Sequence, residues 1–165
     1  MDGLTDEQAN WQPSPASWSI AQCLDHLARG SVLYAAALRD AVTRTKAAGK
    51  LRRDPVRPGG WLSGYFIRTM EPPPKQKMRA PKKIVPASRI GAREVLDAFL
   101  RTDENVRAVV HEGAHLDLNR IRFKNPFFGF LYFTVGTGLL IMAAHNRRHL
   151  WQAEQVRQSA GFPSH

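Results

Sequence analysis

The spacing of apolar residues predicts a long helix near the beginning of the chain. From about Ile20 to about Ala47, apolar positions recur at steps of three and four, as on one face of a helix. Ser19 followed by Gln22 forms a capping-box pattern, which predicts where the helix begins. The predicted buried face consists of Ile20, Leu24, Leu27, Tyr34, Leu38 and Ala41, with Ser31 filling the gap.

Two more helices are predicted in the second half of the chain. One spans about Ala92 to His111, and Gly113 follows it as a stop signal. Its apolar face holds Leu96, Phe99, Val106 and Val110, widened by Val95, Leu100 and Val109. The other helix is expected from about Phe127 to about Ser159, where Gly161-Phe162-Pro163 closes it.

The start of that last helix raises the question of a membrane span. Residues 127–144 carry no charge over 18 positions, which is the lower length limit for crossing a bilayer. Glycines and threonines interrupt the run, and it continues directly into the polar stretch HNRRHLWQ. We therefore expect a core helix that is apolar all round rather than a membrane span.

The middle of the chain, from Gly49 to Gly91, is predicted to be irregular. It holds seven prolines, at positions 55, 58, 72, 73, 74, 81 and 86. Within it, residues 61–70 (WLSGYFIRTM) fit either a short helix or a strand, and residues 72–83 should be extended and solvated. Such a long connection is either a functional cover or a mobile loop. Strand signals are weak elsewhere, so the expected class is all-α.

Composition and charge narrow the picture. A length of 165 residues with 43% hydrophobic and 23% charged residues fits a single domain over 1–165 rather than a disordered chain. The formal net charge of +10 permits anionic partners, and much of it lies between Arg44 and Arg89. Its basic cluster has no interleaved aromatic residues for base stacking, so nucleic-acid or membrane-surface binding is the less favoured alternative. That cluster is Lys75, Lys77, Arg79, Lys82 and Lys83.

The compartment follows from the single cysteine and the polar N-terminus. Cys23 has no partner for an internal disulfide, and we expect it to be a small buried apolar residue. The first residues, MDGLTDEQ, show neither the basic nor the apolar region of a secretion signal. The expected location is cytoplasmic.

His145 and His149 are the first candidate chemistry. Their i, i+4 spacing places both rings on one helical face, at a separation that suits two imidazoles on one divalent ion. They follow the most apolar stretch and share a side with Ile141 and Val156, so they should point inward. Buried imidazoles need partners, and these are either a metal ion or hydrogen bonds.

His111 and His115 form a second pair within HEGAH, which matches the H-E-x-x-H pattern of zinc peptidases. In those enzymes Glu112 would be the general base. The pattern requires a continuous helix, however, and here it coincides with a predicted helix end containing Gly113. We expect an incidental helix terminus rather than a peptidase site.

His26 and several polar neighbours complete the candidates. His26 lies beside the main apolar stripe of its helix, as a core residue or as a third ligand to the later pair. Gln152, one turn beyond His149, could orient a ligand or be an exposed polar residue. Arg148, with Arg147, could hold an anionic cosubstrate or simply be surface charge. Asp25 should point away from His26, which leaves no carboxylate placed as a general base.

Taken together, these segments resemble the DinB-like (damage-inducible) superfamily, including its bacillithiol or mycothiol S-transferase-like members. The resemblance rests on WQPSPASWSIAQCLDHL, a long middle with KMRAPKKIVP, then NPF and AAHNRRHLWQAEQV, in this order over nearly the whole chain. It implies a four-helix bundle with a metal held by His26, His145 and His149. Only about ten residues precede Trp11, so the first helix is expected to be shortened, unless the true start lies upstream of Met1.

The resemblance also implies a class of activity. Members commonly bind nickel or zinc, often form homodimers, and include metal-dependent thiol S-transferases, hydrolases and isomerases. We therefore expect a metal-dependent enzyme with a low-molecular-weight thiol as cosubstrate. A non-catalytic metal- or ligand-binding bundle is the main alternative. The family name implies no DNA binding.

Overall fold

The structure is a computed structural model, and it describes residues 3–45, 49–75 and 79–164. Helices predominate in it, and a small two-stranded sheet follows the fourth of them. The α-helices are α1 (Asp6–Asn10), α2 (Ile20–Thr45), α3 (Trp61–Met70), α4 (Ala92–Glu112) and α5 (Val135–Arg157), with a short 3₁₀ turn, η1 (Lys82–Ile84). The strands are β1 (Arg122–Lys124) and β2 (Tyr132–Thr134).

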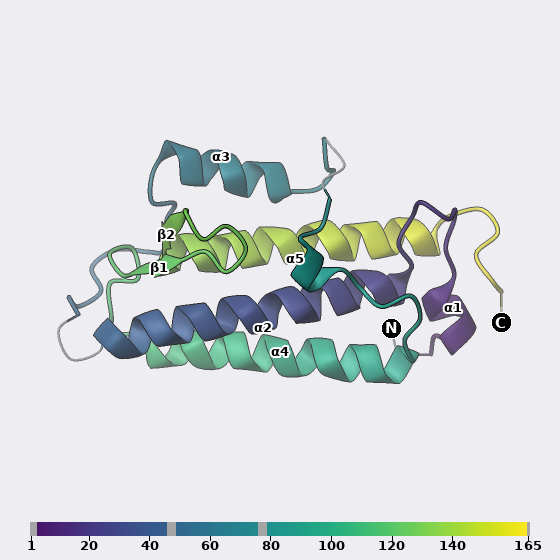
Figure 1. The fold of residues 1–165 in the computed structure, drawn as a ribbon, viewed down its shortest axis with the longest axis horizontal. Helices are drawn as coiled ribbons and strands as arrows, with labels where there is room; N and C mark the ends of the chain where they lie inside the picture. The colour runs from purple at the N-terminus through teal and green to yellow at the C-terminus, as the bar shows by residue number, and fades with distance from the viewer. Residues whose placement is uncertain (1–2, 46–48, 76–78, 165) are drawn as a thin grey trace.

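The three long helices run side by side, and α2 packs against both α4 and α5 (Figure 1). The short helix α3 lies over α5, and η1 contacts α2. The segment after α1 brings the chain back to the beginning of α2. As a result, the middle of α2 is covered by α4 on one side, and by α5 and the long connection on the other.

Helix α2 confirms the predicted first helix in both its start and its buried face. The Ser19 hydroxyl accepts from the Gln22 backbone N–H at 3.1 Å, while Gln22 Oε1 accepts from the Ser19 N–H at 3.0 Å. This reciprocal pair is the capping box that the sequence predicted. Every residue of the predicted stripe is buried, namely Ile20, Leu24, Leu27, Ser31, Tyr34, Leu38 and Ala41. The predicted end at Ala47 lies outside the described residues.

The last helix begins eight residues later than predicted, and the all-α expectation needs a corresponding correction. Residues before Val135 form an antiparallel hairpin, in which Phe123 pairs with Phe133 and Lys124 with Tyr132. The Asn125 side chain accepts from the N–H groups of Phe127 and Phe128, and this turns the chain away from a helix. Phe133 points into the core while Tyr132 is exposed, so the apolar run there has strand periodicity.

Smaller corrections concern α4 and the middle segment. The buried positions of α4 are Ala92, Val95, Thr102 and Val109. The predicted face therefore holds for Val95 and Val109, whereas Leu100 and Val110 are exposed. Residues 61–70, for which either a helix or a strand was predicted, form α3. No helix in the described ranges is long and apolar enough to cross a bilayer.

The close packing of α5 against its neighbours predicts a contrast between two helical glycines. A Cβ added at Gly138 would lie 2.8 Å from the Phe123 ring and 2.9 Å from Leu38, and both of these side chains are fully buried. Gly138→Ala should therefore lower the free energy of unfolding by about 1–3 kcal/mol through overpacking. At Gly64 in α3 the nearest atom is the mobile end of Arg68 at 3.6 Å.

The matched variant Gly64→Ala should leave stability unchanged or raise it by up to about 1 kcal/mol, because alanine favours the helix. Urea unfolding of both variants beside the wild type makes the comparison. Equal stability of the two alanine variants would contradict the packing described for α5.

Candidate metal centre

Three histidines from two helices meet in the interior between α2 and α5. His26 belongs to the second turn of α2, while His145 and His149 lie one turn apart on α5. The His145 Nε2 atom is 3.2 Å from His26 Nε2 and 3.1 Å from His149 Nε2. The ligand atoms of all three lie within 4.8 Å of one another. The structure thus brings together the three residues for which the sequence suggested a common site.

The hydrogen bonds of the outward-facing Nδ1 atoms of His26 and His149 determine which nitrogen of each ring carries the proton. His26 Nδ1 is 2.7 Å from the Ile84 carbonyl oxygen, and His149 Nδ1 is 3.1 Å from Gln152 Oε1. Both oxygens are acceptors, so each Nδ1 carries the proton and each Nε2 of these two neutral rings presents a lone pair. His145 Nε2 can donate to only one of them. The Nε2 lone pair of the other ring therefore has no donor, unless a cation lies between the rings.

The spacing of the nitrogens fits a divalent ion. Metal–nitrogen bonds of about 2.0–2.1 Å place neighbouring ligand nitrogens about 2.8–3.0 Å apart in octahedral geometry and about 3.3–3.4 Å apart in tetrahedral geometry. The separations of 3.1 and 3.2 Å from His145 Nε2 to its two neighbours lie between these values. The hydrogen bonds behind His26 and His149 are the kind that orient metal-binding imidazoles. The three-histidine donor set is therefore compatible with a divalent metal ion.

Burial keeps the three rings neutral in the metal-free protein. Desolvation lowers the pKa of His145 to about 3 and that of His149 to about 2, and the nearby histidines and Arg148 add to the effect. Desolvation also lowers the pKa of His26, against smaller opposing contributions from Ile84 and Asp25. Neutral imidazole is the form that binds a metal ion, so all three rings are in the binding form at neutral pH.

Trp18 forms one wall of the centre. Its ring stacks on His149 with centroids 5.5 Å apart and packs on His26 at 4.8 Å. Trp11 and Trp18 both pack on the cluster formed by Ile20, Cys23, Ala153 and Val156. Trp18 additionally fixes the orientation of two of the histidine rings. Cys23 is fully buried, as expected, and burial raises the pKa of its thiol to about 12.

The long connection covers the histidine cluster. The Ile84 carbonyl holds His26, Glu71 pairs with Arg147, and the Thr69 carbonyl accepts from Arg148 at 3.0 Å. Of the two alternatives left open by the sequence, these contacts favour a functional cover. They also correct the surface alternative for Arg148, which is 8% exposed and lies near enough to lower the pKa of His145 and His149.

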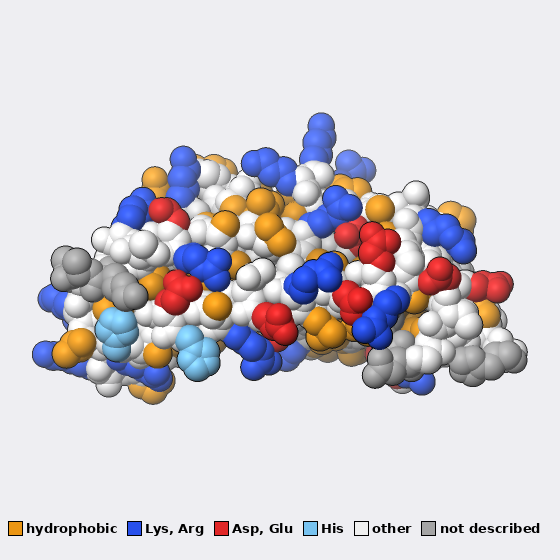
Figure 2. All heavy atoms as spheres, turned by 90° about the horizontal axis from the view of Figure 1, so that it is seen from below, with side chains coloured by type: hydrophobic (Ala, Val, Ile, Leu, Met, Phe, Trp, Pro, Cys, Tyr) orange, Lys and Arg blue, Asp and Glu red, His pale blue; other side chains and the backbone are white. Residues whose placement is uncertain are grey.

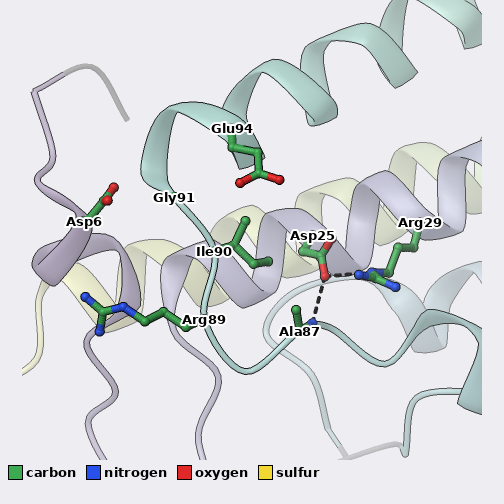
Figure 3. Close-up of a pocket in the computed structure, with 8 residues that line it drawn as sticks. All are labelled: Asp6, Asp25, Arg29, Ala87, Arg89, Ile90, Gly91 and Glu94. Atoms are coloured by element: carbon green, nitrogen blue, oxygen red, sulfur yellow. Dashed lines mark hydrogen bonds and ion pairs between the residues drawn. The ribbon is translucent and has the colours of Figure 1, made fainter.

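A separate cavity lies away from the cluster, on the side of α2 where α1 and the beginning of α4 meet (Figure 3). It measures about 440 Å³ and is lined by Asp25, Arg29, Arg89 and Glu94, among others. Asp25 accepts from Arg29 and from the Ala87 N–H, and Asp6 accepts from the Ala92 N–H. These hydrogen bonds give the Asp25 and Asp6 carboxylates a structural role. They also keep Asp25 away from the histidines, as the sequence indicated.

The HEGAH segment does not form a peptidase site. Helix α4 ends at Glu112 with Gly113 as its C-cap, so His111 and His115 do not share a helical face. Both histidines are exposed, and Glu112 pairs with Arg39.

The face of the molecule seen from below Figure 1 shows basic and acidic side chains interleaved (Figure 2). Helix α4 carries i, i+4 ion pairs between Arg93 and Asp97 and between Arg107 and Asp103.

Fold and site together define a mostly helical protein with a buried three-histidine cluster compatible with a divalent metal ion. A family model described as the DinB superfamily matches residues 1–153. The chain belongs to the DinB superfamily. No curated protein and no solved structure matches it.

Proposed function

We propose that the protein is a metal-dependent enzyme that binds one nickel or zinc ion through His26, His145 and His149. Its proposed activity is that of a thiol S-transferase or a hydrolase. The observation that carries the proposal is that the Nε2 atoms of His26 and His149 lie 3.2 and 3.1 Å from His145 Nε2, with protons held on the far side of these two rings. A cluster evolved only for packing would gain nothing from a buried ring nitrogen that lacks a donor. A cation supplies the missing partner.

The chemistry of such a site depends on the positions that the protein leaves open. Three protein ligands are fewer than the four that a structural zinc site uses. A divalent ion held there would supply Lewis acidity and lower the pKa of a water or thiol that binds it. The protein's own contribution is to hold the neutral imidazoles, to exclude water with Trp18 and the connection, and to direct anions inward.

Arg148 supports an anionic ligand such as a thiolate. Its guanidinium is buried near the cluster, and burial lowers its pKa without removing the charge at neutral pH. The three imidazoles are neutral, so no protein ligand cancels the charge of the ion. Two positive charges in a poorly hydrated interior favour a small anion.

The test begins with metal content by mass spectrometry on protein as purified, followed by replacement of the ion with Co(II). Titration with 2-mercaptoethanol should produce a saturable sulfur-to-cobalt absorption band, because an open coordination position accepts the thiolate. Arg148→Gln should weaken this binding about tenfold, which corresponds to about 1.4 kcal/mol. The neighbouring Arg147→Gln should change it by less than about twofold, since Arg147 is exposed and pairs with Glu71.

The outcomes separate the alternatives. A bound ion without any thiol band would contradict the thiol-transferase reading and favour the hydrolase or the non-catalytic metal-binding bundle. Protein without a stoichiometric ion would overturn the metal site itself. Glu112→Gln should leave metal content unchanged in every case, because Glu112 lies at the end of α4, bound to Arg39.

Two further proposals concern the helical bundle and the oligomeric state. We propose that α1, α2, α4 and α5 correspond to the four helices of the family bundle, with α1 as a first helix shortened to five residues. We also propose a homodimer, which light scattering would test through the molar mass in solution.

Binding to nucleic acid through the basic cluster stays the less favoured prediction. Lys77, one residue of that cluster, lies outside the described residues.

A further inference from the structure

A small cavity adjoins the histidine cluster between α2 and α5. It measures about 20 Å³, enough for about one water-sized group. Helix α2 contributes Gly30, Ser31 and Tyr34, one to two turns beyond His26. Helix α5 contributes Ile141, Met142, His145 and Asn146, and Phe127 closes one side. His145 belongs to both the cluster and the cavity, so the two spaces share a wall.

Asn146 is the residue in this cavity that the fold does not explain. Its Oδ1 atom is buried and has no hydrogen-bond partner among the described residues. Leaving such an acceptor unpaired costs about 1–3 kcal/mol, so a native structure retains it only for a reason. The comparable amide of Asn125 is fully used, since it donates to the Tyr34 hydroxyl and accepts from two backbone N–H groups. Packing against α2 alone would be served better by leucine at position 146.

The surroundings indicate what kind of group would complete Asn146. Ser31 and Tyr34 are buried polar neighbours in this cavity, and Ile141, Met142 and Phe127 form apolar walls. The space is small and partly apolar, so a charged or bulky group is excluded. The partner must be a single neutral hydrogen-bond donor the size of a water molecule. A hydroxyl group on a ligand of the neighbouring ion has both properties.

We propose that this cavity is the inner subsite of the ligand pocket, where the Asn146 side-chain oxygen accepts a hydrogen bond from a hydroxyl group of the ligand bound at the histidine cluster. The inference rests on the proposed function, because it assumes an exogenous ligand on the ion. It makes Asn146 a specificity-determining residue. Ligands with a donor a few bonds from their metal-binding atom should be preferred over ligands of equal size without one.

The experiment pairs two thiols with two forms of residue 146. Co(II)-loaded protein is titrated with 2-mercaptoethanol, which carries a hydroxyl donor, and with 1-propanethiol, which has similar size and none. Wild-type protein should bind 2-mercaptoethanol about three- to tenfold more tightly, the range expected for one hydrogen bond. Asn146→Leu, which keeps the size of the side chain, should abolish that preference. Asn146→Ala is the second variant, in case leucine disturbs the packing.

Asn105→Leu is the matched control, because Asn105 is exposed on α4, a helix that contributes no lining residue to this cavity. It should retain the wild-type preference and the wild-type metal content. An unchanged ratio of the two affinities in Asn146→Leu and Asn146→Ala would overturn the subsite while leaving the metal-dependent function intact. Absence of a sulfur-to-cobalt band with either thiol in wild-type protein would instead reject the thiol proposal and this subsite with it.

Discussion

Replacing His149 with alanine should lower the affinity for the divalent ion by more than about 100-fold. The variant removes one of three converging Nε2 atoms, and no carboxylate in the described ranges joins the cluster to replace it. Loss of a residue that merely orients a ligand already costs about 10–100-fold, so loss of a ligand should cost more. Gln152→Leu tests that lesser effect, since Gln152 accepts the proton of His149 Nδ1. Metal affinity is measured by competition with a chromophoric chelator.

His111→Ala is the control for this series, because His111 is an exposed histidine at the end of α4. It should bind the ion as the wild type does. The expected order of affinity is therefore wild type equal to His111→Ala, then Gln152→Leu, then His149→Ala. A His149→Ala protein that keeps its ion at wild-type affinity would show that the cluster is not the metal centre.

Acid should destabilise the metal-free protein well above the pH at which its carboxylates become protonated. In the unfolded chain a histidine has a pKa of about 6.5, whereas the folded pKa is about 3 for His145 and about 2 for His149. Between pH 6.5 and about 3 the unfolded state therefore binds protons that the folded state does not. Stability falls as pH falls, by at most about 1.4 kcal/mol per pH unit for each such histidine.

Urea unfolding of chelator-treated protein between pH 7.5 and 4.5 measures this dependence. His149→Gln should show a shallower slope, because it removes one group whose protonation differs between the two states. His111→Gln should retain the wild-type slope. Identical slopes in all three proteins would mean that the buried histidines are not held neutral by the fold.

The sequence was most informative where local rules dominate. The start of α2 could be predicted because the Ser19–Gln22 pair is a local interaction, and its buried stripe because one helix face packs against two neighbours. The beginning of α5 was predicted wrongly for a related reason. A wholly apolar run carries no periodicity to distinguish a strand from a helix, and the turn at Asn125 depends on side-chain hydrogen bonds that hold the hairpin.

The candidate site likewise has features that the sequence predicted and features that it did not. Spacing alone placed His145 and His149 on one face, and the order of motifs added His26. Nothing in the sequence indicated that the Ile84 carbonyl would hold His26, because every residue has a carbonyl and only the path of the chain selects one. Nor did the sequence indicate that Trp18 would stack on His149, or that the buried Arg148 would donate to the Thr69 carbonyl.

The sequence by itself therefore determined the long helices, the candidate histidines and the superfamily. Tertiary structure alone decided which ring nitrogens face inward, what covers them, and that the Asn146 Oδ1 atom is buried beside them without a hydrogen-bond partner among the described residues. The physical reason is that periodicity and capping act within a few residues along the chain. Hydrogen-bond direction, desolvation and cavity shape instead arise between segments as far apart as α2, the connection after α3, and α5.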